Sequence, residues 1–484
     1  MTTLSRRRLL LSGAAAGASS VLSTRAKADL PPPKYLFVVG AMGGASIIDS
    51  FLPVRESASS AGATLATFAD SLVTRPAGSN LDCVVPLSME LAGPPAFKGD
   101  FSQATFLANH AADTAVMTVE VSSVNHLIAQ SRALTGAGLN RGRTVLEAAA
   151  LTHGKGLPLP VVNMMSGGYA APGRDSGLAM EGRQVVVTDP RTFAFSVHGQ
   201  KGLAHQVPQA SLDRARAARE RLEAVSDFGR TFASTPNRLE YLALRQRGLS
   251  VESADLISKL MLLSGPGLAA VGLTPSAELQ RLRGIFPALD TDPFEAQAAL
   301  AFLLVSARVS TAVGLGVSNS IRTVNESGQQ LVTNAQLGFD YSHTNHRVTQ
   351  SSMWSRVLKV TDGLIRLLKQ TDDASRPGTS LWANSLVYIA TDFGREKHRP
   401  AAGTLTWGSG HHLNNGAVLV SPLLRGNRVY GGVDANTCLT YGFDRATGAP
   451  QPGTVMGEVD VYHAVCGALG VDYAGRVPMP ALVK

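Results

Sequence analysis

Short, continuous apolar runs recur along this chain of 484 residues, and they constrain its fold more than any other feature. The clearest are residues 35–39 and 384–390, which are typical of strands buried on both faces. Segments with helical periodicity lie between such runs, for example at 127–134, 294–309 and 348–371. Because strands alternate with helices, the sequence predicts an α/β fold, with a mostly parallel sheet covered by helices on both faces.

A charged helical region interrupts this alternation. Residues 211–225 are amphipathic and rich in Arg and Glu, and helical patterns continue to residue 282. No internal repeat accompanies them. We expect a single α/β domain over residues 29–484, with a helical insertion at about 205–290.

Charge and cysteine content exclude several classes of protein. The net charge is +8, but five of the 44 basic residues lie in residues 1–28, which contain no acid. The remaining 39 basic residues face 36 acids, so the body has no basic excess for nucleic acid. Three cysteines exclude a disulfide scaffold and a Cys-ligated zinc module, and leave open whether Cys438 and Cys466 pair.

The first 28 residues have the pattern of an export signal. Three consecutive arginines, Arg6 to Arg8, precede a weakly apolar stretch, and Ala26-Lys27-Ala28 matches a cleavage site. Paired arginines with a weak apolar core resemble the twin-arginine signal, whose machinery exports folded proteins. An ordinary secretory signal or an uncleaved anchor is the alternative. We expect a periplasmic or secreted protein with no stable membrane span after cleavage.

Polar residues follow several of the expected strands. In a parallel sheet, ligands bind beyond the carboxyl ends of the strands, so these positions are candidates for a site. Asp49 follows the first strand, and Ser122 and His126 follow the second. Asp392 and Arg395 end the clearest strand.

Four of the eleven histidines fall in two short windows next to expected strands. His343 and His346 follow Asp340 in one window, and His411 and His412 form the other. Imidazole and carboxylate together suit Zn, Mn or Fe, whereas oxygen ligands alone favour Mg or Ca. The set therefore indicates a metal or oxyanion site. The alternative is loop histidines that cap helices or bind backbone groups.

Five motifs, in order, resemble those of the bacterial DUF1501 family. Residues 43–51 resemble the family's GGxSxxDxF opening, and Asn125-His126 with residues 134–136 resembles its H…TG segment. Phe339-Asp340 with His343 resembles the W-D-T-H motif. Residues 390–395 resemble T-E-F-G-R, and Gly410-His411 resembles D-H-G. The family is similar to the alkaline-phosphatase-like hydrolases. The resemblance thus implies that fold and metal-dependent hydrolysis of a phosphate, sulfate or phosphonate ester.

The resemblance also implies roles for individual residues. Ser122 matches a nucleophile at a helix N-terminus, where the helix dipole and a metal would lower its pKa. Asp340, His343 and His411 match metal ligands, and Asp392 matches a ligand of a second metal. With Zn or Mn as the divalent metal, we expect His126 to belong to the catalytic group. Arg395 would bind an anionic oxygen of the substrate.

Several positions depart from the superfamily pattern. Phe393 follows Asp392 where the superfamily has His, and Gly40-Ala41 replaces the Asp that ends its first strand. Asp340 and His343 are one residue further apart than in W-D-T-H, and Gly410 replaces the Asp of D-H-G. These departures favour the alternative function, a non-catalytic periplasmic or cell-surface binding or assembly protein that retains the hydrolase fold.

Overall fold

Two strands far apart in sequence form the centre of the molecule. In the computed structural model, every residue of β1 (Tyr35–Ala41) and of β12 (Ser385–Thr391) is buried. The two strands pair in parallel, from Tyr35 opposite Ser385 to Ala41 opposite Thr391. The structure describes residues 32–86, 90–91, 97–98, 101–197, 207–253, 256–270, 272–317, 320–324, 330–334, 338–401, 404 and 407–484. The predicted export signal at 1–28 lies outside these residues.

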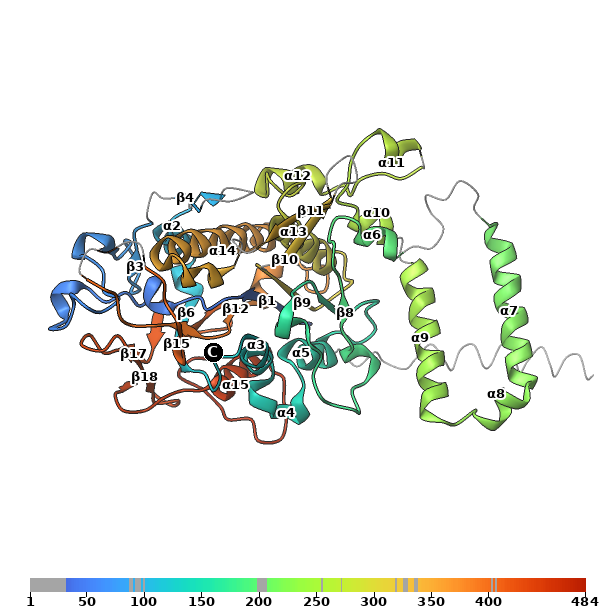
Figure 1. Cartoon of the computed structure of the whole chain (residues 1–484). Coiled ribbons are helices and arrows are strands. Elements are labelled where there is room, and N and C mark those ends of the chain that lie inside the picture. Colours follow the sequence, from blue (N-terminus) through green and yellow to red (C-terminus); the bar gives the residue numbers. More distant parts are fainter. Residues whose placement is uncertain are drawn as a thin grey trace, which may run out of the picture. The chain divides into compact units, whose positions relative to one another are not determined.

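Six further strands complete the sheet around this pair (Figure 1). The order is β16 (Arg428–Tyr430), β6 (Thr114–Glu120), β15 (Asn414–Val420), β12, β1, β9 (Ala312–Val317), β7 (Val161–Asn163) and β8 (Val185–Val186). Only β15 runs antiparallel to its two neighbours, and all other pairings in this sheet are parallel. The predicted α/β fold with a mostly parallel sheet is confirmed.

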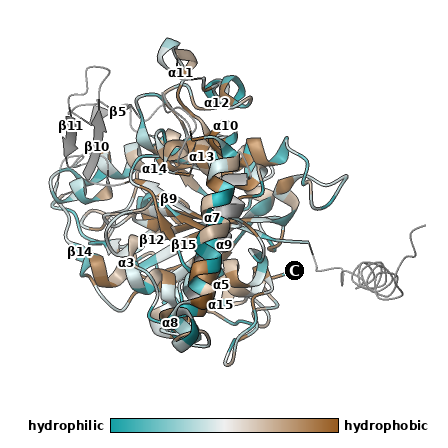
Figure 2. Ribbon diagram, turned by 90° about the vertical axis from the view of Figure 1, so that its right-hand side faces the viewer, coloured by the Kyte–Doolittle hydropathy of each residue, from teal (hydrophilic) through white to brown (hydrophobic). Residues whose placement is uncertain are grey.

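Helices cover both faces of the sheet, because successive side chains of each strand point to opposite sides. Phe37 and Val39 of β1 belong to one apolar cluster, and Leu36 and Val38 belong to another. The first face packs against α2 (Gln103–His110), α13 (Pro293–Ser306) and α14 (His346–Lys369). The second packs against α3 (His126–Thr135), α5 (Val145–His153) and α15 (Glu458–Leu469). Apolar colouring accordingly marks the central strands in Figure 2.

The predicted insertion divides into two parts. Its helices are α7 (Gln209–Val225), α8 (Asp227–Thr231), α9 (Pro236–Ser253), α10 (Leu256–Leu260), α11 (Pro266–Ala270) and α12 (Leu279–Ile285). Leu256 and Ile257 of α10 and Leu282 of α12 are fully buried in the first apolar cluster. The chain from residue 256 onward therefore contributes to the main core, whereas no described side chain of the helices before it is buried.

The remaining elements are short and lie at the margins of the sheet. They are β2 (Val73–Thr74), β3 (Cys83–Val84), β4 (Glu90–Leu91), β5 (Phe97–Lys98), α4 (Leu139–Gly142), α6 (Phe193–Ser196), β10 (Ser320–Val324), β11 (Gln330–Asn334), β13 (Gly394–Arg395), β14 (His411–His412), β17 (Gly432–Val433), β18 (Thr440–Phe443) and β19 (Pro450–Gln451). All three cysteines are buried and free, so Cys438 and Cys466 do not pair. Within the described residues, the search for a helix long and apolar enough to cross a membrane found none.

Candidate metal centre

One edge of the sheet collects side chains from four distant parts of the chain. The parallel strands β1, β6 and β12 all end at this edge. Because β15 is antiparallel to these strands, it begins at the edge where they end. Its first residue, Asn414, pairs with Glu120, the last residue of β6. The loop before β15 is thereby brought beside the segments that follow the other strands.

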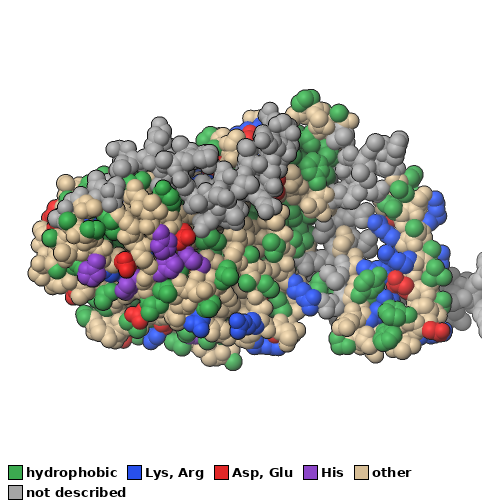
Figure 3. All heavy atoms as spheres, viewed as in Figure 1, with side chains coloured by type: hydrophobic (Ala, Val, Ile, Leu, Met, Phe, Trp, Pro, Cys, Tyr) green, Lys and Arg blue, Asp and Glu red, His purple; other side chains and the backbone are tan. Residues whose placement is uncertain are grey.

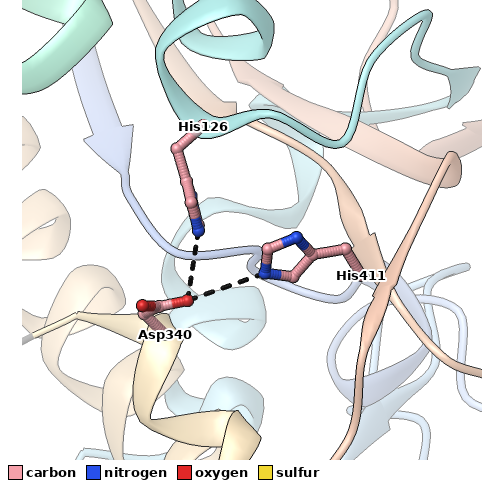
Figure 4. A group of neighbouring side chains, drawn as sticks. All are labelled: His126, Asp340 and His411. Atoms are coloured by element: carbon pink, nitrogen blue, oxygen red, sulfur yellow. Dashed lines mark ion pairs between the residues drawn. The ribbon is translucent and has the colours of Figure 1, made fainter.

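Three histidines and one carboxylate meet at this edge. Figure 4 shows three of these side chains, His126, Asp340 and His411. Oδ1 of Asp340 lies 3.3 Å from Nε2 of His126, 3.3 Å from Nε2 of His343 and 3.8 Å from Nε2 of His411. Nε2 of His343 and Nε2 of His411 are 2.8 Å apart. Ligand atoms of His126, Asp340 and His411 all lie within 4.8 Å of one another. One small cation placed between the atoms of His126, Asp340 and His411 can contact all three, while His343 lies beside Asp340 and His411 and outside this group.

The other ring nitrogens fix how two of the imidazoles face this centre. Nδ1 of His126 lies 2.7 Å from Oδ2 of Asp392, and Nδ1 of His411 lies 3.0 Å from the carbonyl oxygen of Val124. Both partners are acceptors, so each Nδ1 carries the proton and donates it. Nε2 of each ring faces the centre and offers its lone pair there once it carries no proton, as in metal-binding histidines whose opposite nitrogen is held by an outer oxygen.

Asp392 holds His126 from a fully buried position. Its carboxylate accepts hydrogen bonds from the backbone nitrogens of Gly43 at 3.1 Å and Gly44 at 2.6 Å. The side-chain amide of Gln130, one turn after His126 on α3, donates to it at 3.3 Å. These donors compensate for burial of the charge. Asp392 therefore orients His126, and its expected role as a ligand of a second metal stays a prediction.

Gly43 allows the chain after β1 to pass close to Asp340. Its φ is +100°, and a Cβ added there would lie 2.2 Å from the backbone nitrogen of Asp340. The backbone nitrogen of Phe339 donates to the carbonyl oxygen of Met42 at 2.9 Å, which joins the two segments. Only glycine fits this close approach with a positive φ.

Arg395 also positions Asp340, and it has no exposed surface. Its guanidinium donates to Oδ1 of Asp340 at 3.2 Å and to the carbonyl oxygens of Gly43, Phe339 and Ser409. All of these partners belong to the protein. The expected role of Arg395 in binding a substrate oxygen does not agree with these contacts, because the side chain is enclosed.

The charges at the centre oppose one another. Burial lowers the pKa of His126, but hydrogen bonds and charge from Asp340 and Asp392 raise it more, to about 9. The hydrogen bond from His126 holds the pKa of Asp340 well below its usual range, and the charges of His126, Arg395 and His343 contribute. Burial and the charge of Arg395 lower the pKa of both His343 and His411. The two latter histidines are thus neutral and available as ligands at neutral pH.

The centre is open to solvent. The side chain of Asp340 is 31% exposed and that of His343 is 46% exposed. Figure 3 shows histidine and carboxylate side chains gathered on one face of the molecule. An ion and a small ligand can therefore reach the cluster without movement of the core.

The structure gives Ser122 a different setting from the expected one. Its hydroxyl donates to Oε1 of Glu458 at 2.7 Å and accepts from Nη1 of Arg132 at 2.5 Å. No contact among the described residues joins it to the histidine cluster. A nucleophile role for Ser122 would require it to leave both partners.

A second polar group lies buried beneath the centre and involves His346. Nε2 of His346 is 3.1 Å from Oδ2 of Asp49, and its Nδ1 is 2.8 Å from the hydroxyl of Ser409. Arg347 donates to the other oxygen of Asp49. These groups are at most 5% exposed, and Ser409 lies two residues before His411. The hydrogen bond between His346 and Ser409 holds the loop that carries His411. His346 therefore stabilises this loop and is not part of the open histidine cluster.

Two imidazole nitrogens and one carboxylate oxygen, from His126, His411 and Asp340, form a donor set suited to Zn, Mn or Fe, and His343 lies beside it. The structure brings together Asp340, His343 and His411 of the expected ligands, and adds His126, which the sequence placed with the catalytic group. The signal for His126 is its position after β6, which follows the same strand-end rule. Comparison with protein-family models, curated proteins and solved structures found no match to this chain.

Proposed function

We propose that the cluster of His126, Asp340, His343 and His411 binds one divalent transition metal, Zn or Mn. The observation that supports this most directly is the orientation of His126 and His411. Each has its Nδ1 proton held by an oxygen outside the centre and its Nε2 directed into it. Histidines that only cap loops do not require this shared direction.

We further propose that the protein is an exported, metal-dependent hydrolase of phosphate, sulfate or phosphonate esters, related to the DUF1501 family and the alkaline-phosphatase-like hydrolases. A bound divalent ion supplies Lewis-acid catalysis by polarising an ester oxygen and making water nucleophilic at neutral pH. His126, His343 and His411 hold the ion, and Asp340 offsets its charge. The ester class is based on the resemblance of the motifs.

Phe393 supports a centre with one metal. Its ring centroid lies 4.1 Å from that of His411 and 4.6 Å from that of His126. An apolar ring thus occupies the space beside both histidines, at the position where the superfamily pattern has a His. Asp392 is turned toward backbone nitrogens and His126 on the same side.

The alternative, a binding or assembly protein that keeps the fold without catalysis, is favoured by the setting of Ser122. Its contacts with Glu458 and Arg132 leave the centre without a serine nucleophile. A hydrolase with this centre must use water as the nucleophile, whereas a binding protein needs none.

Metal analysis and turnover of the purified protein test the proposal. We expect about one equivalent of Zn or Mn per chain, given a single group of converging ligand atoms. Hydrolysis of aryl phosphate, sulfate or phosphonate monoesters should be abolished by a chelator. His411→Ala should lose metal and turnover, while His412→Ala, which changes the neighbouring histidine outside the cluster, should retain the metal. A metal-loaded protein without turnover on all three esters would support the binding protein, and a protein that takes up no metal would refute the centre.

A further inference from the structure

The arm formed by α7, α8 and α9 contains no buried side chain among those that the structure describes between residues 207 and 253. A helix of this length gains most of its stability from burying an apolar face. Of 17 large hydrophobic residues exposed in the described chain, seven lie between Leu222 and Leu242. The arm therefore presents an apolar surface that nothing in the described chain covers.

Ion pairs, and not an apolar core, hold α7 against α9. Glu223 of α7 accepts from Arg238 at 3.0 Å and from Arg245 at 2.6 Å, both on α9. The space between the helices is a cavity lined mainly by Arg216, Arg219, Glu220, Glu223, Arg238 and Arg245. These side chains are 11–23% exposed, and ion pairs that water reaches typically contribute about 1 kcal/mol or less each, so this contact alone stabilises the arm weakly.

The apolar residues of α7 form one stripe. Ala215, Ala218, Leu222 and Val225 follow one another at spacings of three and four residues, which places them on one face of a helix. Leu222 is 68% exposed and Val225 is 65% exposed. The stripe lies away from the side that carries the ion pairs with α9.

The apolar surface continues over the bend into α8. Phe228 is 63% exposed, and its ring lies 5.0 Å from that of Phe232, which is also exposed. In Figure 3, apolar side chains lie beside basic ones on this part of the molecule. The apolar side chains thus lie on two helices, α7 and α8, that run in different directions. A bilayer surface can accept side chains from both helices, whereas a single partner helix would need one straight groove.

The charges beside the stripe are basic. Arg221 and Arg219 flank Leu222 on opposite sides of α7, and Arg219 also lines the cavity toward α9. Within the described contacts, neither arginine forms an ion pair. Three acids of the arm, in contrast, pair with arginines within the arm: Asp213 with Arg216, Glu223 with Arg238 and Asp227 with Arg230. Two copies of the arm would bring these arginine borders together, so charge disfavours self-association and favours an anionic surface.

We propose that this arm binds an anionic phospholipid surface, with Leu222, Val225, Phe228 and Phe232 entering the interface. The stems of Arg219 and Arg221 extend along the apolar layer while their guanidinium groups contact lipid phosphates. This inference is independent of the metal centre and of the reaction proposed for it.

Vesicle flotation of the purified full chain tests this inference. The probes are vesicles of phosphatidylglycerol with phosphatidylcholine, and vesicles of phosphatidylcholine alone. We expect binding to the anionic vesicles only, weakened by about 30-fold in Arg219→Gln/Arg221→Gln, the loss expected for two charges near an anionic surface. Phe228→Ser/Phe232→Ser should abolish binding. Val455→Ser/Val477→Ser, which changes exposed valines elsewhere, should bind like the wild type.

Melting temperatures close to the wild type establish that each variant is folded, as expected for exposed positions. No binding to anionic vesicles by the wild type would overturn the proposal. Undiminished binding by the Phe228→Ser/Phe232→Ser variant would also overturn it, since charge alone would then hold the protein. A wild-type dimer in light scattering that the same variant dissociates would assign the surface to protein contact and refute the lipid role.

Discussion

Replacing Asp392 by Asn separates the two roles that the structure gives to this carboxylate. Asp392 satisfies the backbone nitrogens of Gly43 and Gly44, and it holds the Nδ1 proton of His126. Asparagine has nearly the same shape but only one acceptor oxygen. If that oxygen faces His126 and Gly43, its NH₂ group faces the N–H of Gly44, so two donors confront each other.

The size of the effect follows from these contacts. An unsatisfied buried N–H of Gly44 costs about 1–3 kcal/mol, and the bonds to Gly43 and His126 lose their charge-assisted strength. A neutral amide is easier to bury than a carboxylate, which offsets part of this loss. We expect the free energy of unfolding to fall by about 2 kcal/mol. Metal affinity should fall about tenfold, as is common when a group that orients a ligand is changed.

Two measurements give the two effects separately. Urea unfolding of metal-free protein, followed by the fluorescence of the three buried tryptophans, gives the stability. Competition with a fluorescent chelator gives the affinity for Zn. Asp70→Asn is the matched control, because Asp70 also accepts a backbone N–H, from Ser57, but lies exposed and outside the centre. That variant should leave metal affinity unchanged.

The reasoning fails if Asp392→Asn is destabilised but binds Zn as tightly as the wild type. Asp392 would then stabilise the loops after β1 without orienting His126 for a metal. Complete loss of the metal in a stably folded variant would also contradict it, because Asp392 would then be a direct ligand.

Three further predictions concern other parts of the chain. Gly43→Ala should unfold the site and lose metal, because the added Cβ would overlap the backbone nitrogen of Asp340. Gly78→Ala is the control: Gly78 has a similar positive φ but no atom within 4 Å of an added Cβ, so this variant should show only the smaller backbone strain. Melting curves and metal content compare the two variants. The pKa of His126 is raised to about 9, so the metal-free protein should lose stability as pH rises from about 6.5 to 9, and His126→Gln should remove this slope in melting temperature. Arg6→Lys/Arg7→Lys should leave unprocessed precursor in the cytoplasm, and normal export on fractionation would reject a twin-arginine signal.

The sheet could be predicted from the sequence because its central strands are apolar throughout. Residues 384–390 have no plausible place except a buried strand, and the structure places β12 there. The expected ligands were found by the rule that sites follow strand ends. His411 is an exception to this rule, because it precedes its strand. It reaches the same edge of the sheet only because β15 is antiparallel, and the sequence did not show that direction.

The roles of Arg395 and Asp392 could not be predicted from the sequence. A motif shows which residue types follow a strand, but not whether a side chain turns outward or back into the loops. Arg395 turns inward to the carbonyl oxygens of Gly43 and Ser409, each brought there by long-range pairing. Burial of a charge depends on such partners, and they are set by the tertiary fold.

The four donors of the centre depend on the complete sheet. His126 follows β6, Asp340 is joined to the segment after β1, and His411 precedes β15, so none of these residues lies near another before the strands pair. A metal that requires all of them binds the native chain and not the unfolded one. At a free concentration one hundred times its dissociation constant, it would stabilise the fold by about 2.7 kcal/mol. Metal occupancy should therefore fall together with the unfolding of the sheet, whereas the α7–α9 arm, none of whose described side chains is buried, can be altered without loss of the metal.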